Sequence, residues 1–192
     1  MSLINVNEIM LQKAYTDIHK EIIELSKAGN GKAQSKLYSL YAKAMFNICM
    51  RMLAIKEEAE DALQEAFTEV FDKLDSFRYD SAFGAWVKRI VVNTCINKIK
   101  GRQNALTYSD DIDHEIEEEK EPDIEEIELQ VKNVHNAIQK LPDGYRIVFC
   151  LYLLEGYDHT EISEILKISE STSKTQYMKA RRKIKEILNT SS

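Results

Sequence analysis

The sequence is poor in the residues that interrupt helices. Its 192 residues include only six glycines and two prolines, and hydrophobic residues make up 44% of the composition. Apolar residues recur with helical period along much of the chain, whereas no sustained alternation of apolar and polar residues is present. These features exclude a β-sheet protein and a disordered chain, and they predict an all-α protein with packed cores.

Cysteine and histidine are also scarce. Cys49, Cys95 and Cys150 are odd in number, far apart and each set in an apolar helical stretch, which favours buried thiols over a disulfide or zinc set. The four histidines lack the spacing of metal ligands, and no nucleophile–base set or glycine-rich phosphate loop is present. We therefore expect no metal, no cofactor and no enzymatic activity.

Long apolar runs are missing as well. No stretch has the length and composition of a membrane-spanning helix or of a signal peptide. The expectation is a cytoplasmic protein without membrane insertion.

The negative charge is concentrated in one segment. The chain carries a net −6, but residues 110–128 hold twelve acidic residues and one lysine, a net −11, which leaves +5 on everything else. The charge distribution is therefore compatible with nucleic-acid binding even though the total charge is acidic.

The same segment predicts the domain organisation. Residues 104–123 are polar, lose helical periodicity and contain Pro122, as is typical of a solvated flexible linker. A linker this acidic can also imitate nucleic-acid phosphate, and the two interpretations are compatible. We thus predict two small helical domains, residues 5–103 and 124–190, joined by the acidic flexible linker 104–123.

Residues 141–188 predict a C-terminal helix-turn-helix. Leu141 and Pro142 end one helix, and the next, with apolar Val148, Phe149, Leu151, Tyr152 and Leu153, ends near Gly156. Asp158 and Glu161 have capping-box spacing, and Ser169 can cap a second helix after a turn of about three residues. That helix is expected to face inward with Ser173, Tyr177, Ala180, Ile184 and Ile187, and outward with Ser171, Thr172, Lys174, Thr175, Gln176, Lys179, Arg182 and Lys183. The geometry suits a recognition helix in a major groove, and a helical hairpin with a solvated basic face is the alternative.

The N-terminal module reads as several amphipathic helices. Ile18, Ile22 and Leu25 suggest a first helix that ends near Gly29, and a second begins near Lys32. The helix from Glu57 to Leu74 has the clearest apolar stripe, made by Leu63, Ala66, Phe67, Val70, Phe71 and Leu74. Its other face is strongly acidic, so we expect that face to bind protein rather than DNA.

A loop and a basic helix follow. The helix from Phe83 to Arg102 carries an apolar face, which includes Trp86, and a polar stripe of Arg89, Asn93, Asn97 and Lys100. In the preceding loop, Phe77, Arg78 and Tyr79 are candidates for meeting an unstacked base, because aromatic and guanidinium planes stack on any base. The combination suits single-stranded DNA.

In order along the chain, these segments resemble the extracytoplasmic-function sigma factors of bacterial RNA polymerase, a group of the sigma-70 family. The run Ala59–Phe67 resembles the segment that grips the β′ clamp helices. The run Phe83–Asn93, with its Trp and its Arg-Ile-x-x-Asn, is similar to the strand-melting and minus-ten segment. Residues 141–188 resemble the domain that reads the minus-thirty-five element and docks on the β flap.

The resemblance implies a promoter-recognition factor that binds core RNA polymerase and promoter DNA and aids strand opening, with the chemistry left to polymerase. By this resemblance, Asp61, Gln64 and Glu65 would contact core polymerase. The resemblance assigns minus-ten DNA to Phe77, Arg78, Tyr79, Arg89, Asn93, Asn97 and Lys100, with the loop from Asp75 to Ala82 holding a flipped base, and minus-thirty-five DNA to Ser171, Thr172, Lys174, Thr175, Gln176 and Lys179.

The chain departs from the family pattern at a few of these positions. Many members carry Asp and Arg where this chain has Asn97 and Lys100, and Gly, Val and Arg where it has Lys167, Ser173 and Gln176. Gln176 would pair with adenine where an arginine prefers guanine. Ser173, at an inward position, would bury an unpaired hydroxyl unless it bonds a carbonyl one turn earlier, so its replacement by valine is expected to stabilise the domain.

Two other functions remain open from sequence alone. A stand-alone helix-turn-helix regulator would give a symmetric operator footprint without polymerase, and a helical scaffold would have no DNA role. The sequence leaves open whether an anti-sigma factor binds.

Overall fold

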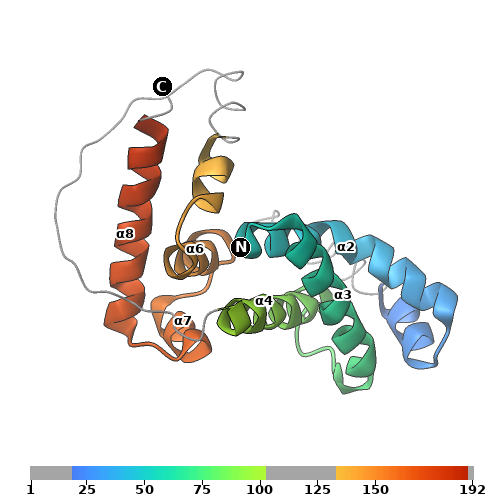
Figure 1. The fold of residues 1–192 in the computed structure, drawn as a ribbon. Coiled ribbons are helices and arrows are strands. Elements are labelled where there is room, and N and C mark those ends of the chain that lie inside the picture. Colours follow the sequence, from blue (N-terminus) through green and yellow to red (C-terminus); the bar gives the residue numbers. More distant parts are fainter. Residues whose placement is uncertain (1–18, 103–132, 190–192) are drawn as a thin grey trace, which may run out of the picture. The chain divides into compact units, whose positions relative to one another are not determined.

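The structure, a computed structural model, describes residues 19–102 and 133–189. Within these ranges every regular element is a helix, which confirms the predicted all-α class (Figure 1). The acidic segment 104–123 lies outside the described residues, so its linker role stays a prediction.

The described helices follow one another at short intervals. Residues 19–27 and 133–139 are helical, and the remaining elements are α2(Gly31–Leu53), α3(Lys56–Asp72), η1(Leu74–Ser76), α4(Phe83–Arg102), α6(Asp143–Phe149), η2(Cys150–Leu154), α7(His159–Leu166) and α8(Glu170–Asn189). The chain divides into two compact units: Met1–Cys49 with Glu57–Thr94, and Met50–Lys56 with Cys95–Ser192. The helices α2 and α4 each continue from the first unit into the second.

The apolar stripe of α3 forms much of the core of the first unit. Leu63, Ala66, Phe67 and Val70 are buried, as the periodicity predicted. Helix α3 ends two residues earlier than expected, at Asp72, yet Leu74 in the short 3₁₀ turn η1 is still buried. The stripe is therefore continued by the turn that follows the helix.

Residues 19–27 form the predicted first helix, which ends just before Ala28 and Gly29. His19, Ile23 and Ser26 point inward, whereas Leu25 is 44% exposed. The apolar residues that indicated the helix therefore do not all lie on its buried side. Ser26 is tolerated inside because its hydroxyl donates a hydrogen bond of 2.7 Å to the carbonyl of Ile22, one turn earlier.

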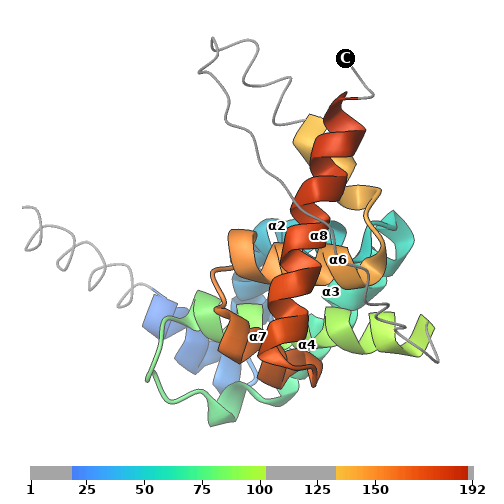
Figure 2. The same cartoon turned by 90° about the vertical axis from the view of Figure 1, so that its left-hand side faces the viewer.

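In the second unit, α8 packs across α6 and α7 (Figure 2). Both predicted helix starts are confirmed: Asp158 and Glu161 form a reciprocal capping box, and the hydroxyl of Ser169 accepts a 3.0 Å hydrogen bond from the amide of Thr172. The intervening turn is Lys167, Ile168 and Ser169, the predicted length.

The helix before α7 ends in a wider winding than expected. Val148, Phe149 and Leu151 are buried as predicted, but Tyr152 is 36% and Leu153 54% exposed. The reason is the π-helical turn η2, in which the amide of Glu155 donates to the carbonyl of Cys150, five residues back. This winding moves the later side chains off the buried face.

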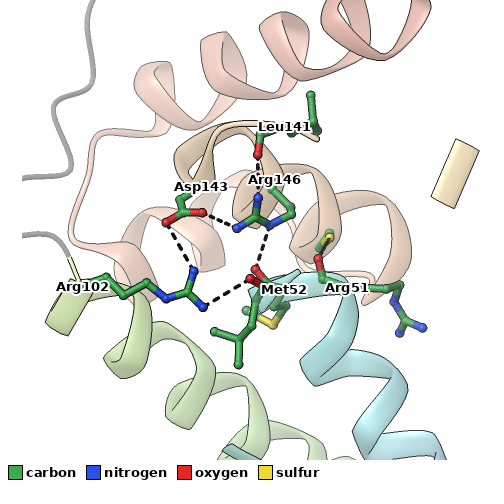
Figure 3. Close-up of polar contacts among 8 residues, drawn as sticks. Arg51, Met52, Arg102, Leu141, Asp143 and Arg146 are labelled. Atoms are coloured by element: carbon green, nitrogen blue, oxygen red, sulfur yellow. Dashed lines mark hydrogen bonds and ion pairs between the residues drawn. The ribbon is translucent and has the colours of Figure 1, made fainter. Parts of the chain in front are cut away.

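A buried arginine organises the second unit at the end of α2 (Figure 3). Arg146 is 4% exposed, and its Nε donates to the carbonyl of Met52 at 3.0 Å while Nη1 donates to that of Leu141 at 2.6 Å. Its Nη2 pairs with the carboxylate of Asp143, and Arg102 lies 3.9 Å from the same carboxylate. All three guanidinium nitrogens therefore have acceptors, as a buried charge requires.

We predict that Arg146→Met lowers the free energy of unfolding by about 3 kcal/mol, because two buried carbonyls and a carboxylate lose the guanidinium that donates to them. Urea unfolding followed by circular dichroism measures this. The matched control is Arg182→Met, which removes an exposed arginine with a surface ion pair to Glu186 and should cost less than about 1 kcal/mol. Equal losses for the two variants would contradict a structural role of Arg146.

Candidate DNA- and protein-binding surfaces

The acidic face of α3 is exposed along its length. Asp61, Gln64 and Glu65 all lie in solvent, on the side opposite the buried stripe of Leu63 and Phe67. Helical spacing of three and four residues places the three side chains next to one another. The structure thus brings together the three residues that the sequence assigned to a protein partner.

The polar stripe of α4 is also exposed as predicted. Arg89, Asn93, Asn97 and Lys100 follow one another at helical spacing and are all in solvent. The opposite face is buried, and it includes Thr94, whose hydroxyl donates to the carbonyl of Ile90 at 3.0 Å. A row of amide and cationic groups along one helix can track a nucleic-acid backbone and bond to base edges.

The loop before α4 differs from the prediction at Phe77. This ring is only 4% exposed and lies 5.2 Å from Phe83 and 5.3 Å from Trp86, so it belongs to the core and cannot stack on a base in this conformation. The burial could not be predicted, because an aromatic residue in a polar loop gives no local sign of which way it points, and the base contact of Phe77 stays a prediction. Arg78, the next residue, is exposed.

Tyr79 is half-buried and held by residues that the sequence analysis missed. Its hydroxyl donates a 2.6 Å hydrogen bond to Glu24, and Lys27 lies 5.0 Å from its ring centre. Because 55 residues separate Tyr79 from Glu24, no local pattern could have identified the contact.

On α8, the predicted groove-facing residues are exposed or half-exposed except one. Ser171 and Lys174 are exposed, and Thr172, Thr175 and Lys179 are half-exposed. Gln176 is only 3% exposed, so its side chain is covered in this conformation, and its contact with adenine stays a prediction. The helix repeat explains the burial, because position 176 lies three residues after buried Ser173 and four before buried Ala180.

Two further departures from the family pattern have local structural explanations. Lys167 has a left-handed backbone (φ +61°) at the C-cap of α7, which is where glycine is favoured. Ser173 is fully buried, and its hydroxyl lies 2.9 Å from Nδ1 of His159. The expected unpaired hydroxyl is therefore absent, because the partner is a histidine from α7 rather than a backbone carbonyl.

The imidazole of His159 joins the helix-turn-helix core through its ring as well. It stacks on Tyr152 with ring centres 4.3 Å apart and planes 10° apart, and it meets the edge of Tyr177 at 5.9 Å. His159 thus links η2, α7 and α8, a role that its position in the sequence did not indicate.

The described residues contain neither a metal-binding cluster nor a membrane-spanning helix. No group of histidine, cysteine, aspartate or glutamate side chains there is arranged to hold a metal ion. Among the described helices, none has the length and apolar character needed to cross a membrane.

Comparison with known proteins matches both parts of the chain. Residues 37–105 match the family model of sigma-70 region 2, and residues 132–184 match that of sigma-70 region 4. The first match contains the acidic face of α3 and the polar stripe of α4, and the second contains α6, α7 and most of α8.

Relatives align over nearly their whole length. The ECF RNA polymerase sigma factor SigW of Bacillus subtilis is 30% identical over 183 residues, covering 88% of this chain and 96% of that protein. The ECF RNA polymerase sigma-E factor of Escherichia coli K12 is 29% identical over 173 residues, covering 85% and 90%. The sigma factor RpoE of Bartonella quintana, solved with the anti-sigma factor NepR, has a similar fold, with a TM-score of 0.53 and 20% identity over 81% of this chain and 96% of that one.

The Ser173–His159 contact reverses the expectation from sequence. We predict that Ser173→Val lowers the free energy of unfolding by about 1 kcal/mol, because Nδ1 of His159 loses its partner. In a His159→Phe background, where the ring stays and the nitrogen is gone, the same substitution should cost nothing or stabilise. Denaturant midpoints of the four proteins in this cycle measure the coupling, and additive effects would show that the hydrogen bond contributes nothing.

Proposed function

This chain belongs to the extracytoplasmic-function sigma factors of the sigma-70 family, and on that premise we propose how its surfaces divide the work of promoter recognition. It is a transcription initiation factor. In the proposal it supplies binding surfaces and no catalytic residue, and it acts where polymerase acts, in the cytoplasm.

In this proposal, core polymerase binds the acidic face of α3. Asp61, Gln64 and Glu65 are exposed and contribute nothing to the buried stripe, so a partner can use them without disturbing the core. Opposite charge on the partner would speed encounter and fix orientation. By the family resemblance that partner is the pair of β′ clamp helices, and the β flap takes the helix-turn-helix.

Promoter DNA binds two further surfaces in this proposal. The exposed stripe of Arg89, Asn93, Asn97 and Lys100 fits the minus-ten region, together with the loop from Asp75 to Ala82, in which Arg78 is exposed. The exposed and half-exposed residues of α8 fit the minus-thirty-five major groove: Ser171, Thr172, Lys174, Thr175 and Lys179. Each surface alone is small, so polymerase is needed to hold them at a fixed separation and raise their effective concentration.

An anti-sigma factor is part of the proposal. The similar sigma factor RpoE was solved with the anti-sigma factor NepR, which supports a partner of that class for a chain of the same fold.

The observation that carries the proposal is that two consecutive helices expose faces of different charge. The exposed face of α3 is acidic, and that of α4 is polar to basic. The test is run-off transcription from fragmented genomic DNA with core polymerase, with and without the chain. New transcripts that need the chain are expected. A symmetric footprint on DNA without polymerase, and no new transcript, would instead support a stand-alone regulator.

The acidic face gives a sharper prediction. Asp61→Arg combined with Glu65→Arg should leave helicity and thermal midpoint nearly unchanged, since both side chains are exposed, but should abolish co-purification with core polymerase. The control carries the same change of charge elsewhere in the first unit, at exposed Glu21 and Asp75, and should bind core polymerase like the parent. Retention of core polymerase by the folded Asp61/Glu65 variant would refute the assignment.

A further inference from the structure

The loop that follows η1 is fastened to the first helix of the described chain. Tyr79 has a left-handed backbone (φ +64°), which a non-glycine residue seldom adopts without support from its surroundings. That support comes from residues 19–27: Glu24 accepts the Tyr79 hydroxyl at 2.6 Å, and Lys27 donates to the carbonyl of Phe77 at 3.1 Å. The loop is thus held by its backbone and by a side chain.

Lys27 connects these two contacts. Its ammonium lies 3.1 Å from the same Glu24 oxygen and 5.0 Å from the centre of the Tyr79 ring. Glu24, Lys27 and Tyr79, named here the Tyr79 cluster, therefore contain a carboxylate, a cation and a phenol in mutual contact. Burial and the Glu24 carboxylate raise the pKa of Tyr79, and the hydrogen bond from Tyr79 followed by that from Lys27 lowers the pKa of Glu24. Donor and acceptor keep their roles at neutral pH.

The neighbours of Arg78 are both engaged within the protein. Phe77 is buried against Phe83 and Trp86, and its ring also lies 4.8 Å from that of Tyr79. Arg78, between them, is exposed. An anchored residue on each side leaves the guanidinium as the group of this tripeptide that can reach DNA.

We propose that helix 19–27 fixes the conformation of the loop from Asp75 to Ala82, here called the minus-ten loop, through the Tyr79 cluster. Tyr79 is then a positioning residue, and Arg78 is the side chain that the loop presents to the promoter. The proposal rests on the proposed function and deepens it by adding Glu24 and Lys27. Both residues lie outside the loop, so no pattern in the loop indicates them. A loop held in its binding conformation before DNA arrives loses less freedom on binding, and it discriminates between bases because misplaced groups cannot readjust.

The test uses the full chain with core polymerase on a promoter found by the run-off experiment. Templates carrying each of the four bases at each minus-ten position of the non-template strand are transcribed in competition, and the readout is the ratio of preferred to disfavoured templates. Tyr79→Phe and Glu24→Ala should each lower that ratio roughly fivefold, the effect of one lost hydrogen bond. The double variant should be no worse than either single one, and Arg78→Ala should lower the ratio at least as much.

Controls separate positioning from other roles. Tyr38→Phe removes the hydroxyl of a tyrosine that is 37% exposed on α2 and should leave the ratio unchanged. Affinity for core polymerase should be the same in all variants. A normal ratio for Tyr79→Phe with a reduced one for Tyr79→Ala would mean that the ring itself stacks on a base, which overturns the proposal.

Two other results are also decisive. Additive effects of Tyr79→Phe and Glu24→Ala would show that the two do not act through one contact, and a fall in core affinity parallel to the ratio would make the cluster merely structural. Either overturns the inference while leaving the proposed function intact. Absence of any transcript with the unmodified chain would instead defeat the proposed function.

Discussion

The end of α2 leaves backbone carbonyls that no further turn of helix can satisfy, and the second unit is arranged around them. The carbonyls of Arg51, Met52 and Leu53 accept from Cys150 at 3.6 Å, from Arg146 at 3.0 Å and from Arg102 at 3.3 Å. Ala54 then turns the chain with a left-handed backbone (φ +61°), which ends the helix. Because an unsatisfied buried carbonyl costs about 1–3 kcal/mol, these donors decide which helices can lie beside that end.

The functional surfaces follow from the same division of each helix into a buried and an exposed side. On α3 and α4 the exposed sides carry the groups assigned to polymerase and DNA, so core packing and recognition rest on different residues of one helix. On α8 the buried and exposed residues are harder to predict from the sequence. Positions 173 and 176, where the chain departs from the family pattern, are both buried, and Ser173 contacts His159 of α7.

Local features of the fold could be predicted from sequence, and distant ones could not. The capping box of Asp158 and Glu161 spans three residues, and the stripe of α3 repeats every turn, so both are visible as patterns. One partner of Arg146, the carbonyl of Met52, lies 94 residues away, and Glu24, which accepts from Tyr79, lies 55 away. Phe77 was assigned to DNA by residue type, because nothing in the loop itself shows that its ring packs against Phe83 and Trp86. Gln176 was assigned by the family resemblance, although the helix repeat places it between buried Ser173 and buried Ala180.

The three cysteines make local opening of the protein measurable by chemistry. All are unbridged and fully buried, and burial raises the pKa of the Cys150 thiol to about 12, so the buried Cys150 is almost entirely a thiol at neutral pH. Alkylation must therefore wait for a fluctuation that exposes each sulfur, and its rate reports the free energy of that fluctuation. Cys49 samples the first unit, and Cys95 and Cys150 sample the second, where Cys150 becomes accessible only when its own bond to the last turn of α2 has parted.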